Sequence, residues 1–464
     1  MTMETNFMRF KLLYFVLFSG LGILMPYIPV FFELLSLSKS RIGILSMLPN
    51  LCSFLLAPIF AMLADKFDAN CEVIIFGLVT SVASTVTIYF TRSFFALFWV
   101  VFAASAFRAP VTPQVDALVI AALPDKTKYG DMRLWGAISF GIFSFLGGSL
   151  FDPNAGTDSF KYIFFLHALT FLLAGYIVLS ITYDLIRQTN IPHHHEHRHD
   201  KTAHRPLLRA LADVFIQHPS VFVFSFIVFL SGFGSGVIDA FLFLRLKQLG
   251  GSGLVMGLSR FITCAAEVPM FQIAGPLHKR YGTWIILAVT QLAFVLRFTY
   301  YAFLTNPWAV LPCEVLHGLT FATMWSVACT YANLISPPEC HSTMQALLEG
   351  LHWGFGSGMG ALVGGFVYDN WGAVWLFEAS AVLSVFSLAL SIVAYFFAAP
   401  DSELQGGYSS VEISEGQEGT VTTTQDDEEE GGVLQVIELG SNSDVAEKVV
   451  ELTTQKPKAS NEQK

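Results

Sequence analysis

The chain has 464 residues, of which 53% are hydrophobic and only 13% are charged, and its mean hydropathy is +0.56. A soluble domain carries about 25% charged residues, so the composition excludes a cytosolic enzyme, a secreted disulfide scaffold and a disordered chain as the main body. The net charge of −10 divides unevenly, because residues 399–464 hold 15 acidic residues and four lysines, which leaves +1 on the first 398 residues. The excess apolar surface therefore faces lipid, and no basic surface for nucleic acid is present.

Apolar stretches long enough to cross a hydrocarbon core of about 30 Å recur along the chain. We expect twelve spans, at residues 10–32, 42–64, 72–91, 94–122, 130–151, 160–183, 220–244, 253–276, 282–304, 307–334, 342–367 and 372–398. One long polar interruption divides them six and six. The sequence thus predicts an all-α membrane protein with one six-helix bundle at 1–183, a His-rich linker at 184–219 and a second bundle at 220–398.

Lys and Arg residues between the spans predict how the chain is oriented. With a cytosolic N-terminus, thirteen of them fall on the cytosolic side and six on the opposite side. We therefore expect both termini and the linker in the cytosol, in the plasma membrane or an organelle membrane. Residues 399–464 are rich in Gly, Ser, Thr and Gln and contain the acidic run 426–430, which predicts a disordered cytosolic tail.

Two short segments recur at a nearly constant spacing. Residues 63–68 (LADKFD) match residues 277–282 (LHKRYG) at an offset of 214. Residues 146–152 (LGGSLFD) match residues 363–369 (VGGFVYD) at an offset of 217. Two matches at corresponding positions predict two parallel six-helix halves, with a solute site near the middle of the membrane between them.

Ionisable residues inside the predicted spans are the main indication of function. Each costs about 2.5–3.5 kcal/mol to insert, so each is expected to be paired or to face a wet cavity. The candidates are Arg108, Asp116, Arg133, Asp239, Arg260, Glu267, Arg297, Glu314, His317, Glu349 and His352. Asp116 and Arg133 lie at similar predicted depths, which predicts an ion pair between them.

Carboxylates in this set suggest coupling to protons. Burial favours the protonated form of a carboxyl group, and an approaching arginine favours its release. Glu267 and Glu314 are the expected proton carriers, and Arg108 is positioned to bind an anionic or hydroxyl-rich solute. The alternative is that these groups only hold the helices together.

The twelve spans and their division resemble the major facilitator superfamily over residues 10–398. Residues 129–136 (YGDMRLWG) resemble the phenylpropionate-permease and lactose-permease-like branch, which consists of proton-coupled symporters of small organic solutes. The resemblance implies transport by alternating access and a functional Asp116–Arg133 pair. Arg297, Glu314 and His317 resemble the permease's cluster of Arg, His and Glu, except that here the acidic residue precedes the histidine, and they are expected to bind solute or protons.

Part of the superfamily's loop signature is present in both halves. The resemblance implies that the gating-loop residues are Asp65, Lys66, Lys279 and Arg280. The first copy has Ala61 and Asp68 in place of the signature's glycines, and the second copy lacks the acidic residue.

The predicted linker contains a histidine-rich run. Its metal-ligand candidates are His193, His194, His195, His197 and His199. Although HExxH occurs here, a zincin site needs an amphipathic helix and a third ligand, and the polar surroundings favour a soluble loop or loose zinc binding. A divalent-metal (zinc) transporter using this loop therefore remains an alternative.

A second alternative is a receptor or scaffold that has the same fold without transport. Its acidic tail would then recruit a cytosolic protein partner. The sequence contains neither a GxxxxGK[ST] phosphate loop nor a GxSxG nucleophile motif. We therefore expect neither an enzyme nor a cofactor, and the expected partners are the lipid bilayer, a small solute and protons.

Overall fold

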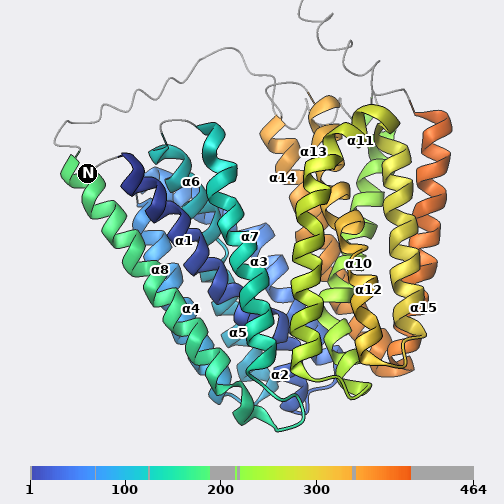
Figure 1. Cartoon of the computed structure of the whole chain (residues 1–464), viewed down its shortest axis with the longest axis horizontal. Coiled ribbons are helices and arrows are strands. Elements are labelled where there is room, and N and C mark those ends of the chain that lie inside the picture. The colour runs from blue at the N-terminus through green and yellow to red at the C-terminus, as the bar shows by residue number, and fades with distance from the viewer. Residues whose placement is uncertain are drawn as a thin grey trace, which may run out of the picture. The chain divides into compact units, whose positions relative to one another are not determined.

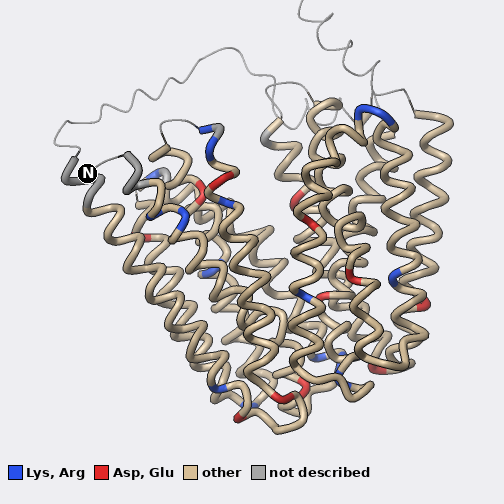
Figure 2. The backbone as a smooth tube through the Cα atoms, in the orientation of Figure 1, with Lys and Arg blue, Asp and Glu red and all other residues tan. Residues whose placement is uncertain are grey.

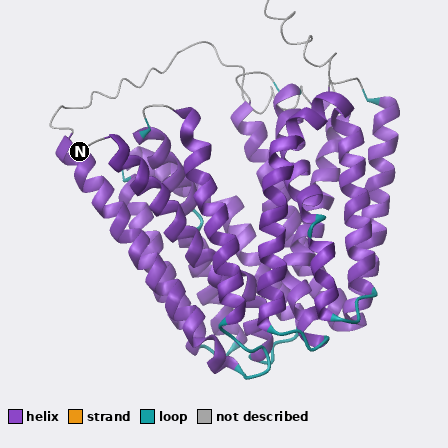
Figure 3. Cartoon of the chain, in the orientation of Figure 1, coloured by secondary structure: helices purple, strands orange, loops and turns teal. Residues whose placement is uncertain are grey.

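The computed structural model describes residues 3–67, 69–123, 126–188, 215–216, 220–336 and 341–398. Every regular element in these residues is a helix (Figure 3). All of these helices belong to one compact unit, Met1–Ser410. Most of the predicted linker, including its histidines, and the predicted acidic tail lie outside the described residues.

The first half makes six passes. Its elements are α1 (Met3–Leu24), η1 (Met25–Tyr27), α2 (Ile28–Leu34), α3 (Lys39–Phe67), α4 (Asn70–Phe90), α5 (Phe94–Arg108), α6 (Val111–Ala122), η2 (Lys126–Lys128), α7 (Tyr129–Ser149), η3 (Thr157–Phe160) and α8 (Lys161–Gln188). Pro26 lies in the break between α1 and α2, and Pro110 lies between α5 and α6. Proline causes such breaks because it lacks an N–H and clashes with the preceding turn.

The second half is interrupted more often. Its elements are α10 (Ser220–Gln248), α11 (Gly253–Ala302), η4 (Pro307–Ala309), α12 (Val310–Glu314), η5 (Gly318–Thr323), α13 (Met324–Leu334), α14 (His341–Glu349), η7 (Gly350–Ser357) and α15 (Gly358–Phe397). α11 turns sharply at Gly282, where φ is 73°, and α15 turns at Gly372, where φ is 90°. Only glycine adopts this backbone conformation without strain.

The described helices account for twelve passes. By length and hydropathy alone, eight stretches of the described residues qualify as membrane spans. Two of them, Gly253–Ala302 and Thr343–Phe397, are each divided into two passes by Gly282 and Gly372. α7 and the interrupted stretch 307–334 complete the set. The predicted twelve-helix, all-α membrane architecture is therefore confirmed.

The outer faces of the helices are apolar. Phe95, Trp99, Tyr176 and Phe396 are among many large hydrophobic side chains that are more than half exposed. Charged residues are sparse along the helices (Figure 2). Contiguous apolar surface of this extent is unfavourable in water, so these faces contact lipid.

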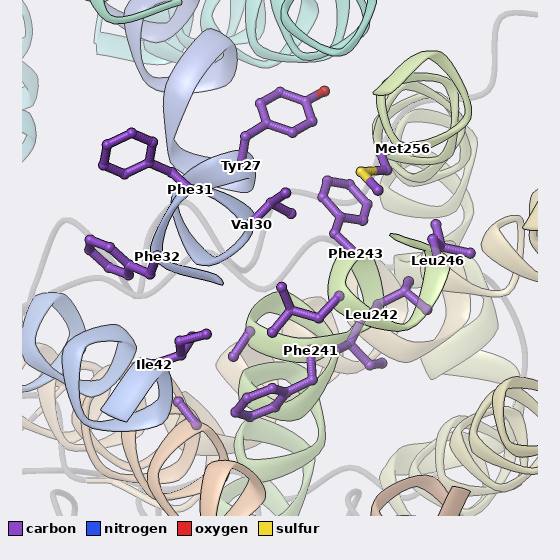
Figure 4. Packing of buried hydrophobic residues seen from close by; sticks show 14 of the residues in the cluster. Tyr27, Val30, Phe31, Phe32, Ile42, Phe241, Leu242, Phe243, Leu246 and Met256 are labelled. Carbon is purple, nitrogen blue, oxygen red and sulfur yellow. The ribbon is translucent and has the colours of Figure 1, made fainter. Parts of the chain in front are cut away.

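The passes form two bundles, which α1–α8 and α10–α15 build (Figure 1). Each bundle has its own apolar core, around Leu13 in the first and around Tyr331 in the second. A third cluster is shared, because Tyr27 of the first bundle packs with Phe243 and Met256 of the second (Figure 4). The bundles therefore join at the end near α2, here called the closed end, and diverge towards the end that contains the N-terminus (Figure 1).

Candidate solute cavity

A cavity of about 830 Å³ lies between the bundles. Its lining includes Met25, Ser46, Asn50, Arg108 and Arg133 from the first bundle and Asp239, Arg260, Glu267, Arg297, His317, Phe321, Trp325 and Trp353 from the second. Pockets for small molecules usually measure about 300–1,000 Å³. The two halves thus enclose a space suited to a small solute.

Arg108 contributes a cation to the wall formed by the first bundle. It is the last residue of α5, immediately before the break at Pro110. Its Nη1 lies 2.7 Å from the thioether sulfur of Met25, which is only a weak acceptor. No carboxylate in the described part of the chain forms an ion pair with Arg108.

Asp116 of α6 and Arg133 of α7 are brought together as the sequence predicts. Arg133 Nε lies 3.7 Å from Asp116 Oδ1, and the hydroxyl of Tyr14 donates to the same oxygen at 2.6 Å. The Arg133 guanidinium also lies 4.3 Å from the ring centre of Phe18, a cation–π contact. The pair therefore links α1, α6 and α7.

A second ion pair lines the cavity from the other bundle. Arg260 Nη2 of α11 donates to Asp239 Oδ1 of α10 at 2.8 Å, and the Arg260 guanidinium lies 5.8 Å from the ring centre of Phe243. The sequence indicates both residues as ionisable groups within spans, but it does not predict their pairing.

Arg297 and Glu314 form a buried ion pair inside the second bundle, where each is 1% exposed. Arg297 Nη2 donates to Glu314 Oε2 at 3.0 Å, and Arg297 Nε donates to the Tyr301 hydroxyl at 2.9 Å. Tyr301 in turn donates to Glu314 Oε1 at 2.7 Å. Arg297 Nη1 also donates to Thr320 at 2.7 Å. Such hydrogen bonds are what makes a buried ion pair tolerable.

His317 connects this network to Glu267 on the cavity wall. Arg297 Nη1 lies 3.1 Å from His317 Nδ1, and His317 Nε2 lies 3.1 Å from Glu267 Oε1. Because arginine can only donate, we assign Nδ1 as an acceptor, which leaves the ring proton on Nε2, the nitrogen nearest Glu267. A neutral imidazole satisfies both contacts, whereas a proton on Nδ1 would point at the Arg297 guanidinium. An added proton is therefore better placed on Glu267.

Three rings form an aromatic wall on the second bundle, comprising Phe321, Trp325 and Trp353. The Phe321 and Trp353 centroids are 5.4 Å apart, and each lies 6.4 Å from that of Trp325. Phe321 belongs to η5 and Trp353 to η7, which are both π-helical. A π-helical turn changes which side chains face a given direction, and such turns are frequent at functional sites.

Four predicted site residues are not part of the cavity lining: Asp116 and Glu314, which pair with lining arginines, and Glu349 and His352. Glu349 is exposed at the end of α14. His352 is fully buried beside Trp325 and Trp353, and its Nδ1 lies 3.4 Å from the carbonyl oxygen of Val228. Their roles in solute or proton binding remain predictions.

Of the predicted gating-loop and metal-ligand residues, the structure describes the side chains of Lys66, Lys279 and Arg280. Lys66 is exposed beside the ring of Phe67, and Lys279 and Arg280 are exposed before the turn at Gly282. The side chain of Asp65 and the metal candidates His193–His199 lie outside the described residues. Their gating and metal-binding roles therefore remain predictions.

Several partners of the charged groups were not predicted from the sequence. Tyr301 lies four residues after Arg297, so helical spacing contained a signal for that contact. Glu33 lies one residue beyond the predicted end of the first span and was not included among the candidates. Tyr14 had no such signal, because its contact with Asp116 joins residues 102 positions apart.

Comparisons with known proteins agree with this architecture. Residues 7–379 match the model of the MFS_1 like family. The maltose permease of Geobacillus stearothermophilus is 26% identical over 372 residues, which cover 79% of this chain and 90% of the permease.

Two further comparisons concern a partial match and a solved structure. A major facilitator superfamily domain-containing protein 6-like of Danio rerio is 30% identical over 182 residues, 38% of this chain, and the match spans about a third (33%) of that relative. The crystal structure of the nucleoside transporter NupG has a TM-score of 0.68 and 15% identity, and the match covers 85% of this chain and 100% of NupG. At this identity the similarity concerns the fold alone.

Proposed function

Since the chain belongs to the MFS_1 like family, we propose that it is a proton-coupled symporter that carries a small organic solute by alternating access. Family membership makes it an integral membrane transporter of small solutes with the major facilitator fold. Its relatives are transporters rather than enzymes, and the two compared over most of this chain are named for maltose and for nucleosides.

The position of Glu267 carries the proposal of proton coupling. Its carboxylate lines the cavity and lies 3.1 Å from His317 Nε2, while Nδ1 of the same ring lies 3.1 Å from Arg297 Nη1. Protonation of Glu267 would weaken its hold on His317, because a neutral carboxyl group is a weaker acceptor than a carboxylate. The proton site is thus connected to the buried Arg297–Glu314 pair, of which Arg297 itself lines the cavity.

The orientation of the bundles completes the proposed cycle. With the termini in the cytosol, the closed end faces away from the cytosol and the described conformation is open to the inside. Release of solute and proton would then occur in this state, and uptake would occur in the opposite one. Gating by Asp65, Lys66, Lys279 and Arg280 belongs to the same proposal.

The experiment that tests coupling is solute uptake into proteoliposomes with an imposed pH gradient. The probes are maltose, uridine and phenylacetate, which represent a neutral sugar, a nucleoside and an organic anion. We expect accumulation of at least one probe above its external concentration, driven by the gradient. Glu267→Gln should abolish this accumulation while solute exchange without a gradient persists.

Glu72→Gln is the matched control, because Glu72 is an exposed carboxylate in the first turn of α4, away from the cavity lining. It should behave like the unmodified protein. Accumulation that persists in Glu267→Gln would exclude Glu267 as the proton carrier. Probe uptake that does not depend on the pH gradient would contradict symport.

A further inference from the structure

The charges around the cavity identify one cation that lacks a partner. Four arginines line it, and three of them contact carboxylates: Arg133 with Asp116, Arg260 with Asp239, and Arg297 with Glu314. Arg108 is the fourth and forms no ion pair among the described residues. Glu267 is the remaining carboxylate, and its contact is with His317, which the hydrogen-bond pattern leaves neutral.

The net charge of this group therefore depends on Glu267. When Glu267 is ionised, the four arginines and four carboxylates cancel. When Glu267 binds a proton, one positive charge is in excess, and it resides on Arg108. A cation in a low-dielectric cavity without a counter-ion is unfavourable, so the protonated cavity favours an anion with a single negative charge.

The aromatic wall of the second bundle indicates what the uncharged part of the ligand is. Phe321, Trp325 and Trp353 are each partly exposed and line the same cavity as Arg108. The two indole rings and the phenyl ring offer faces and edges against which another ring packs, with about 0.5–1.5 kcal/mol per aromatic pair beyond the burial of area. A saturated, hydroxyl-rich solute cannot form such aromatic pairs and would contact this wall only through its C–H groups.

We propose that the solute is an aromatic monoanion, whose charge binds Arg108 and whose ring packs on the aromatic wall, and that it crosses together with one proton. This inference rests on the proposed symport. One negative charge and one proton then move together, so each cycle transfers no net charge. A neutral solute would leave Arg108 uncompensated in the protonated cavity.

Binding to the purified full-length protein in detergent tests the ligand class, with the melting temperature as the readout. The probes separate the two features: phenylacetate and indole-3-acetate have both ring and charge, cyclohexylacetate has the charge with a saturated ring, and 2-phenylacetamide has the ring without the charge. We expect an aromatic acid to raise the melting temperature and the other two probes to be at least tenfold weaker. No shift with either aromatic acid, or an equal shift with the amide, would overturn the proposal.

Variants assign the two contacts. Arg108→Gln should abolish the shift, Arg108→Lys should retain part of it, and Arg92→Gln should not change it, since Arg92 is exposed outside the cavity. Trp325→Ala should reduce the preference for phenylacetate over cyclohexylacetate, whereas Trp308→Ala, at an exposed tryptophan in η4, should leave it intact. Melting of each variant without ligand establishes that it folds. Retained phenylacetate binding in a folded Arg108→Gln variant would contradict the assignment.

Transport in proteoliposomes separates this inference from the proposed function. With valinomycin and potassium to set the membrane potential, a pH gradient should drive phenylacetate accumulation and a potential alone should not. Accumulation driven by potential alone would contradict electroneutral movement. If maltose or uridine accumulates with protons while no aromatic acid binds, the symport proposal stands and the ligand class is wrong. If an aromatic acid binds but neither the pH gradient nor the membrane potential drives its accumulation, the symport proposal is wrong.

Discussion

Arg297 is among the largest fully buried side chains in the described part of the chain. Replacing a buried ion pair with apolar residues is often neutral or stabilising, whereas removal of one partner costs about 3–5 kcal/mol. Its pairing with Glu314 therefore does not by itself explain why the second bundle contains the charges. The contact with His317 offers a functional reason, because it holds the imidazole in the orientation that places Nε2 3.1 Å from Glu267 Oε1.

This reasoning predicts different results for single and double substitutions. Arg297→Gln should lower the free energy of unfolding by about 3–5 kcal/mol, because Glu314 is left charged and unpaired. Arg297→Met with Glu314→Leu should recover most of that loss while still preventing proton-driven accumulation. Detergent-titrated unfolding and uptake under a pH gradient measure the two quantities. A stable double variant with normal accumulation would show that the pair is only structural.

Glycines determine how closely the helices of the two bundles cross at the closed end. A Cβ atom on Gly148 of α7 would collide with the carbonyl oxygen of Gly253 and lie 2.7 Å from Cα of Gly257, both in α11. At Gly43 of α3, it would collide with the carbonyl oxygen of Ala361 in α15. Small residues at such crossings let helix backbones approach each other and slide.

A larger side chain at this crossing should force the helices apart. We predict that Gly148→Val lowers the free energy of unfolding by about 1–3 kcal/mol, the usual cost of overpacking. Gly175→Val is the matched control, because a Cβ there would have only Leu78 within 4 Å, at 3.8 Å. Unfolding in mixed micelles compares the two variants. Equal stability would show that the α7–α11 crossing tolerates a wider spacing.

Element boundaries were predictable where a local signal existed. Apolar length located the spans, and twelve passes resulted as predicted. The π-helical turns η5 and η7 had no such signal, because they depend on contacts with other helices. For example, Gly354 in η7 packs against the side chain of Phe54 in α3. The aromatic wall depends on those turns, so the sequence did not indicate which rings would face the cavity.

The candidate site was predictable to the extent that charges in lipid need partners. That argument identified Arg108, Asp116 and Arg133, and depth along the helices predicted the Asp116–Arg133 pair. Depth did not separate residues that face the cavity from those that face a neighbouring helix. His352 is therefore buried against α10 although it lies one residue before Trp353.

Ionic contacts join the two bundles at the closed end. Glu33 of α2 forms ion pairs with Lys39 and, at 3.0 Å, with Lys247 of α10. Asp369 of α15 accepts from the Lys39 and Ser40 backbone N–H groups at 3.2 and 3.4 Å, and from the Ser40 hydroxyl at 2.8 Å. A carboxylate from one bundle thus caps the first turn of a helix in the other, where the helix dipole favours negative charge.

Alternating access requires these contacts to break, so weakening them should shift the population towards the opposite conformation. We predict that Glu33→Gln with Asp369→Asn destabilises the closed end by roughly 1–2 kcal/mol and increases amide hydrogen exchange in residues 35–43 and 247–256. Hydrogen exchange measured by mass spectrometry tests this without altering the native cysteines. Asp158→Asn, at an exposed carboxylate in η3, should leave exchange unchanged. If the double variant also exchanges as the unmodified protein does, apolar packing around Tyr27 and Phe243 alone keeps this end closed, and the ionic contacts do not control access to the cavity.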